Sequence, residues 1–179
     1  FGAAGGERMH ALAIGQDDRP VEPARDAKSI GAEETFDHDL TATADLEAAL
    51  LGQAERVARR LTAAALSART VTIKVKLASV RVLSKQRTLP EPLADTISLY
   101  RVACALLAEI GLAGRPVRLT GVSVGQLAER ATEAPQLFVD VSRERRDRLE
   151  AARLSIDARY GDGSVTHAGV LAARPRSRT

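Results

Sequence analysis

Between Arg69 and Pro90 the chain carries six basic side chains and no acidic one. The six are Arg69, Lys74, Lys76, Arg81, Lys85 and Arg87. A run of positive charges without negative ones creates a local electrostatic field that attracts phosphate groups. The chemistry that these residue types favour is therefore contact with a nucleic-acid backbone, which positions a protein without reading the bases. A solvated strand face of an ordinary domain is the alternative, and the charges alone leave both interpretations open.

No other group of side chains has the spacing of a catalytic or metal site. Asp37, His38 and Asp39 are consecutive, and neighbouring strand positions point to opposite faces, so these three side chains do not form a metal site. We interpret them as a solvated turn before the helix. Glu33 and Glu34 alternate in the same way and do not form a carboxylate pair. We therefore predict that this chain holds no nucleophile, no general base, no metal and no other cofactor.

The composition is typical of one mildly basic domain with appendages. The chain has 179 residues, with 26 Lys and Arg against 23 Asp and Glu, and a single cysteine, Cys104. One cysteine excludes an internal disulfide. Aromatic residues make up 3% of the chain and Trp is absent, so the core must be aliphatic. No apolar run reaches the roughly 18–20 residues of a membrane span, and no signal peptide opens the chain. We expect a cytoplasmic protein without a membrane partner.

Apolar residues recur every second residue in some segments and every three or four residues in others. The predicted order is strand, helix, strand, strand, helix, strand. The strands are 29–36, 70–77, 81–89 (ended by Pro90 and Pro92) and 117–124, and the helices are 45–66 (capped by Thr43) and 95–110. This order is the split βαβ, or ferredoxin-like, fold of the α+β class, with both helices on one face of a four-stranded antiparallel sheet. The other face is free to meet a partner.

The basic run occupies the two strands in the middle of this pattern. Lys74 and Lys76 share the polar face of the first, and Arg81, Lys85 and Arg87 share one face of the second. A short turn implies that the strands are neighbours, which predicts a ladder of cations on one surface. Both strands lack the aromatic side chains that stack on unpaired bases, so duplex DNA is favoured over a single strand.

The two ends of the chain are simpler. A short helix at 7–14 is followed by an extended, proline-containing stretch at 16–23. Residues 125–135 are polar and unpatterned, and an apolar island follows at 135–140. An amphipathic helix is predicted at 143–160. Its apolar contact stripe would comprise Leu149, Ala152, Ile156 and Tyr160.

Several strings resemble the bacterial Y-family translesion DNA polymerases of the polymerase IV type, almost continuously over residues 7–124. The strings are Gly15–Pro23, Ala27–Phe36, Thr70–Lys76, Ser84–Pro90 and Arg115–Ser123. The resemblance divides the chain into the end of a thumb domain and start of a linker (1–23), the rest of the linker (24–29), a little-finger DNA-binding domain (30–124) and a tail (125–179).

The resemblance implies a magnesium-dependent DNA polymerase that acts in damage tolerance, near the nucleoid. Its palm and fingers would precede Phe1, so we expect a monomeric fragment that does not polymerise alone. In this family the little finger grips duplex DNA through its sheet. Matched position by position, the implied DNA contacts are Lys28, Ser29, Lys74, Lys76, Arg81, Lys85, Arg87 and Thr88.

The apolar island of the tail resembles the family's sliding-clamp peptide, Gln-Leu-x-Leu-Phe. Here Gln136, Leu137 and Phe138 form a shortened version without the x-Leu pair. The resemblance implies that the glutamine hydrogen-bonds at the rim of an apolar cleft on the bacterial sliding clamp, and that the two apolar side chains fill the cleft. The alternative is that the island anchors the 143–160 helix.

Two further functions stay open on the sequence. One is a catalytically inactive Y-family adaptor that binds the clamp and a partner polymerase, which would differ only in palm carboxylates upstream of Phe1. The other is a free-standing ferredoxin-like binding module. The thumb-like start and the missing initiator Met disfavour the second.

Overall fold

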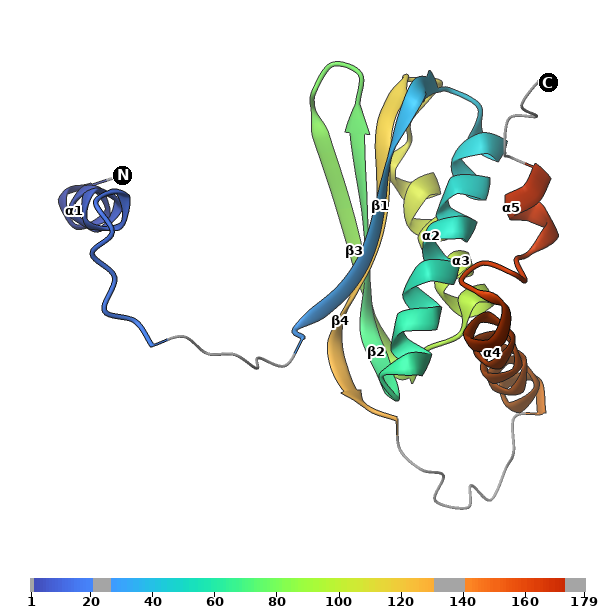
Figure 1. Ribbon diagram of the computed structural model, residues 1–179. Helices are drawn as coiled ribbons and strands as arrows, with labels where there is room; N and C mark the ends of the chain where they lie inside the picture. The colour runs from blue at the N-terminus through green and yellow to red at the C-terminus, as the bar shows by residue number, and fades with distance from the viewer. Residues whose placement is uncertain (1, 21–26, 131–140, 173–179) are drawn as a thin grey trace.

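A computed structural model describes residues 2–20, 27–130 and 141–172. Its centre is a four-stranded antiparallel sheet in the order β1-β4-β2-β3. The elements are β1 Ser29–Leu40, α2 Thr43–Ala63, β2 Leu66–Leu77, β3 Val82–Leu93, α3 Thr96–Ile110 and β4 Val117–Glu129. Both helices lie on one face of the sheet, and no described segment covers the other face (Figure 1). The predicted α+β, split βαβ fold is confirmed.

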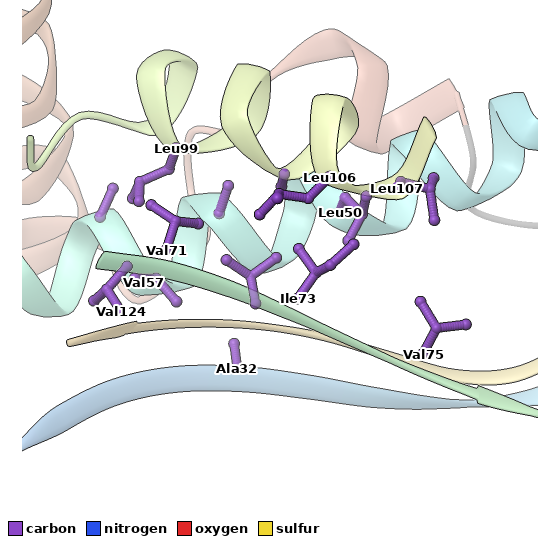
Figure 2. Packing of buried hydrophobic residues seen from close by; sticks show 14 of the residues in the cluster. Ala32, Leu50, Val57, Val71, Ile73, Val75, Leu99, Leu106, Leu107 and Val124 are labelled. Carbon is purple, nitrogen blue, oxygen red and sulfur yellow. The ribbon is translucent and has the colours of Figure 1, made fainter. Parts of the chain in front are cut away.

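An aliphatic core lies between the sheet and these two helices. Val71, Ile73 and Val75 project from β2 towards Leu50 of α2 and Leu99 of α3, and all five side chains are fully buried (Figure 2). Burying one such side chain contributes roughly 1.5–3 kcal/mol. Since the side chains of a strand alternate between faces, this packing also directs the residues in between to the open face of the sheet.

The ends of the helices follow from local hydrogen bonding. Asp95 caps α3, because its carboxylate accepts a hydrogen bond from the backbone N–H of Ser98 at 2.9 Å. The same helix ends at Gly111, whose φ of 63° lies in the left-handed region that glycine tolerates. The prediction that Thr43 caps α2 is wrong. Ala42 occupies the cap position, without a side-chain hydrogen bond, and Thr43 is the first helical residue.

All four strands are longer than predicted. β1 includes residues 37–39, so the predicted turn there is wrong. β3 continues through Pro90 and Pro92, which the sequence suggested would end it. The continuation is possible because β3 is an edge strand, where a proline without an N–H need not pair. β4 continues to Glu129 and includes the start of the stretch predicted to be unpatterned.

The described part of the chain after β4 contains the helices α4 Val141–Tyr160 and α5 Ala168–Ala172. Both pack on α2 on the side away from the sheet, and so add a third layer (Figure 1). The predicted tail helix is present, but its predicted contact stripe is wrong. Leu149, Ile156 and Tyr160 are 49%, 36% and 67% exposed. The side of α4 that faces the domain is charged instead.

A buried ionic network holds the tail against the domain. Glu55 of α2 accepts hydrogen bonds from Arg153 of α4 at 2.5 Å, from the Thr166 hydroxyl at 2.6 Å and from the backbone N–H of His167 at 3.0 Å. Arg153 also contacts Glu150, 3.2 Å away on its own helix. All of these carboxylate and guanidinium groups are buried. α4 therefore docks mainly through charge pairing, whereas α5 brings the apolar side chain of Val170 against Gly52 of α2.

This network makes docking depend on pH. Burial raises the pKa of Glu55, but hydrogen bonds from His167 and Thr166 and the charge of Arg153 outweigh burial and lower the pKa from 4.5 to about 2. The ionised carboxylate therefore stabilises the folded state fully above pH 4.5, and this contribution is lost as the pH falls towards about 2. We expect the urea midpoint, followed by circular dichroism, to fall more steeply over this range in the parent chain than in Glu55→Gln. Equal slopes would contradict the assignment.

Among the described residues before the sheet, helix α1 spans Ala3–Ala13 and so begins earlier than predicted. None of its residues is buried. Within residues 2–20, 27–130 and 141–172, no helix has the length and hydropathy needed to cross a membrane.

Candidate nucleic-acid interface

The pairing register decides which side chains lie on the open face of the sheet. Residues directly opposite each other on neighbouring strands point to the same face. Ile73, which is buried beneath the helices, pairs with Val122 of β4 and Lys85 of β3. The next residue of β2, Lys74, pairs with Gly121 and points the other way. Every second position of the four strands thus belongs to the open face.

Small polar side chains dominate this face. In strand order, its first two rows are Ser29, Gly125, Thr70 and Thr88, then Gly31, Ser123, Thr72 and Gln86. The next two rows are Glu33, Gly121, Lys74 and Ser84, then Thr35, Leu119, Lys76 and Val82. No aromatic side chain occupies any of these described positions. Hydroxyl and ammonium groups of this kind are common partners of phosphate oxygens.

A shallow depression of about 310 Å³ lies over the first two rows. Ser29, Thr70, Thr72, Gln86, Thr88 and Ser123 are among the residues that line it. Across the strand pair, the hydroxyl oxygens of Thr70 and Thr88 are 3.0 Å apart and share a hydrogen bond. Of the residues implied by the resemblance, Ser29 and Thr88 therefore lie in this depression. The other hydroxyl residues of the depression, Thr70, Thr72 and Ser123, were not predicted as contacts from the sequence. For Thr70 and Thr72 a signal existed, because both alternate with apolar residues of β2 that are buried.

The predicted ladder of cations on one surface is wrong. Lys85 and Arg87 pair with Ile73 and Val71, so they lie on the helix side of the sheet. There Lys85 Nζ lies 2.7 Å from Oε2 of Glu109 in α3, and Arg87 pairs with the other oxygen of the same carboxylate. The hydrogen bond from Lys85 is the largest of the effects that hold the pKa of Glu109 below its ordinary value.

The remaining predicted contacts are close to the open face. Lys74 lies in it, with its Nζ 3.0 Å from Oε2 of Glu33. Lys76 lies in the next row, and no carboxylate of the described residues pairs with it. Lys28 is exposed just before β1, and Arg81 is exposed in the turn between β2 and β3. The structure therefore brings one paired and one unpaired lysine together on the face, with two more cations at its ends.

The proposed clamp residues Gln136, Leu137 and Phe138 lie outside the described residues. Among the residues that are described, no three His, Cys, Asp or Glu side chains gather in a way that suits a metal ion. Neither observation adds a reactive group to the open face. What this surface can do chemically is to bind an anionic backbone.

Comparisons with known proteins identify the family of this chain. Residues 27–137 match the model of the impB/mucB/samB family C-terminal domain. A DNA polymerase IV of Desulfatibacillum aliphaticivorans is 39% identical over 93% of this chain and 42% of its own length. Another, of Brucella melitensis, is 34% identical over 89% of this chain and 36% of its own length. This chain thus spans about two fifths of the length of these relatives.

Solved structures show a similar fold. A Y-family DNA polymerase chimera superposes with a TM-score of 0.52 at 21% sequence identity. The superposition covers 70% of this chain and 36% of the chimera. At this identity the likeness concerns the fold alone.

Proposed function

The chain belongs to the impB/mucB/samB family, and on that premise we propose that it is the DNA-gripping little finger and clamp-binding tail of a DNA polymerase IV. The resemblance to Y-family polymerases predicted from the sequence is confirmed by the family match and by the relatives of that name. In this proposal the whole protein is a DNA-directed DNA polymerase that extends primers past damaged bases in the cytoplasm, at the nucleoid. The present chain is a monomer that contributes binding and no catalytic residue.

The observation that carries this proposal is the open face of the sheet. It offers rows of hydroxyl groups together with Lys74 and Lys76, and none of the described positions in these rows is aromatic. Single-strand binding sheets stack bases on aromatic rings, so this face suits a duplex. Phosphate contacts position a protein on DNA without reading the sequence, which is what a polymerase that must accept any template requires.

Magnesium, which nucleotide transfer implies for the whole polymerase, does not fit the described residues of this chain. Magnesium is usually held by carboxylates together with substrate phosphates. No suitable cluster of three His, Cys, Asp or Glu side chains occurs in the described residues. We therefore assign no step of nucleotide transfer to this chain.

The second proposed partner is the bacterial sliding clamp. Gln136, Leu137 and Phe138 follow the last strand and precede α4. Two neighbouring apolar side chains in a charged, proline-preceded segment are suited to a partner's apolar cleft. The role of this segment is proposed from the sequence alone.

The salt dependence of DNA binding tests the open face. Each phosphate contact contributes roughly −0.9 to the slope of log affinity against log salt. We expect Lys74→Ala/Lys76→Ala to flatten this slope by about one to two units. The measurement is fluorescence anisotropy of a labelled duplex titrated with the chain at several salt concentrations.

A matched control comes from the same hairpin. Lys85→Ala/Arg87→Ala removes the same charge from the opposite face, and we expect it to change the slope by less than about half a unit. If Lys85→Ala/Arg87→Ala flattens the salt slope and Lys74→Ala/Lys76→Ala does not, the DNA contacts the helix side of β3 and the proposal is wrong.

A further inference from the structure

One carboxylate, Glu33 of β1, lies inside the proposed DNA-binding face. Its two oxygens are 3.1 and 3.0 Å from Nζ of Lys74 in β2. These strands are not neighbours, because β4 runs between them. The ion pair therefore bridges across a whole strand and holds one of the two lysines of the face.

Gly121 of β4 makes this bridge possible. It lies between Glu33 and Lys74 in the same row of the sheet. A Cβ atom at this position would lie 2.6 Å from Cγ of Glu33, closer than atoms approach without displacement. The backbone of Gly121 is not in the left-handed region, so the residue supplies space rather than an unusual conformation. Any other residue type here would push the glutamate side chain away from Lys74.

We propose that Glu33 is an internal substitute for a DNA phosphate, which occupies Lys74 until the duplex displaces it. This inference rests on the proposed function, because it assumes that the open face binds DNA. A carboxylate and a phosphate are both anions that accept hydrogen bonds from an ammonium group. Only one of them can take the position beside Lys74, so the two compete.

The exposure of the pair makes this exchange possible. The side chains of Lys74 and Glu33 are 42% and 49% exposed. Exposed pairs contribute little to stability, so a phosphate can replace the carboxylate at small cost. After displacement, however, the charge of Glu33 stays near the DNA backbone and takes up a cation from solution. Glu33 therefore lowers the affinity for DNA and makes its salt dependence shallower.

The test compares the Glu33→Gln variant with the parent chain by fluorescence anisotropy of a labelled duplex. We expect Glu33→Gln to bind about threefold to tenfold more tightly at low salt, the size of effect of one nearby charge in water. The salt slope should steepen by up to about 0.9, because no cation is taken up when Lys74 changes partner.

Glu34→Gln is the matched control. Glu34 is the next residue of the same strand, points to the helix side and pairs with Arg56 at 3.0 Å, so the net charge changes equally. We expect this variant to behave as the parent, and the effect of Glu33→Gln to become smaller in a Lys74→Met background, where only the repulsion between its charge and the DNA remains. If both glutamine variants bind alike while Lys74→Ala/Lys76→Ala weakens binding, the inference is wrong and the proposed function stands. If that lysine pair also has no effect, the proposed function itself is wrong.

Discussion

Replacing Arg153 by methionine increases hydrogen exchange of the α4 backbone amides about 100-fold, if the ionic network holds the tail as described. The Arg153 side chain is 7% exposed, and its guanidinium group lies between two buried carboxylates, those of Glu55 and Glu150. Removing one partner of a buried ion pair typically costs about 3–5 kcal/mol, because the other partner is left as a buried, uncompensated charge. At about 1.4 kcal/mol per tenfold change, the lower end of that cost gives the expected factor.

The network also links the tail to α3, which makes the loss larger than that of one pair. Glu150 accepts a hydrogen bond from the backbone N–H of Thr96 at 3.0 Å, and Arg153 contacts the Thr96 hydroxyl at 3.3 Å. Thr96 is the first residue of α3, where backbone N–H groups have no partner within the helix. The tail therefore supplies part of the cap of a domain helix. Methionine in place of arginine leaves Glu150 without its counterion at this position.

The control is Arg148→Met on the same helix. This arginine is 81% exposed and forms a surface ion pair with Glu144. Exposed pairs contribute about 0–1 kcal/mol, so exchange should change by less than about fivefold. Similar exchange in both variants would show that the tail is held by other contacts.

The second large effect is expected in clamp binding. Leu137→Ala/Phe138→Ala should abolish measurable binding of this chain to the bacterial sliding clamp in a calorimetric titration. Burying two such side chains contributes roughly 3–6 kcal/mol before the ordering costs. A micromolar contact corresponds to only about 8 kcal/mol in total, so the loss exceeds about 100-fold. A contact of this strength would let the polymerase enter and leave the replication fork.

An equally apolar pair elsewhere in the tail provides the comparison. Leu149→Ala/Ile156→Ala removes two side chains of α4 that are 49% and 36% exposed. We expect this variant to bind the clamp as the parent does. If the 137/138 variant keeps its affinity, Phe138 is a packing residue. If the α4 variant loses affinity instead, the clamp binds the exposed side of that helix.

The elements and their order followed from local patterns in the sequence. Alternation in residues 70–77 placed Val71, Ile73 and Val75 in the core, because a strand covered on one face buries every second side chain. Repeats of three and four residues located both domain helices, and Gly111 marked the end of α3. Proline was a weaker signal, since whether it ends a strand depends on whether that strand lies at an edge.

The face of α4 that meets the domain was decided by tertiary structure alone, and the faces of β3 were only weakly marked in the sequence. Residues 84–88 of β3 are polar at every position, so only the flanking Leu83 and Leu89, which pack against the core, indicate which side meets the helices. The pairing of β3 with β2 places Lys85 and Arg87 on the helix side of the sheet. In α4, Glu150, Arg153 and Asp157 recur at helical spacing. Burying such charges is favourable only where oppositely charged or hydrogen-bonding groups lie next to them. Those partners, Glu55 foremost, lie about a hundred residues away in the chain and meet α4 only in the folded protein.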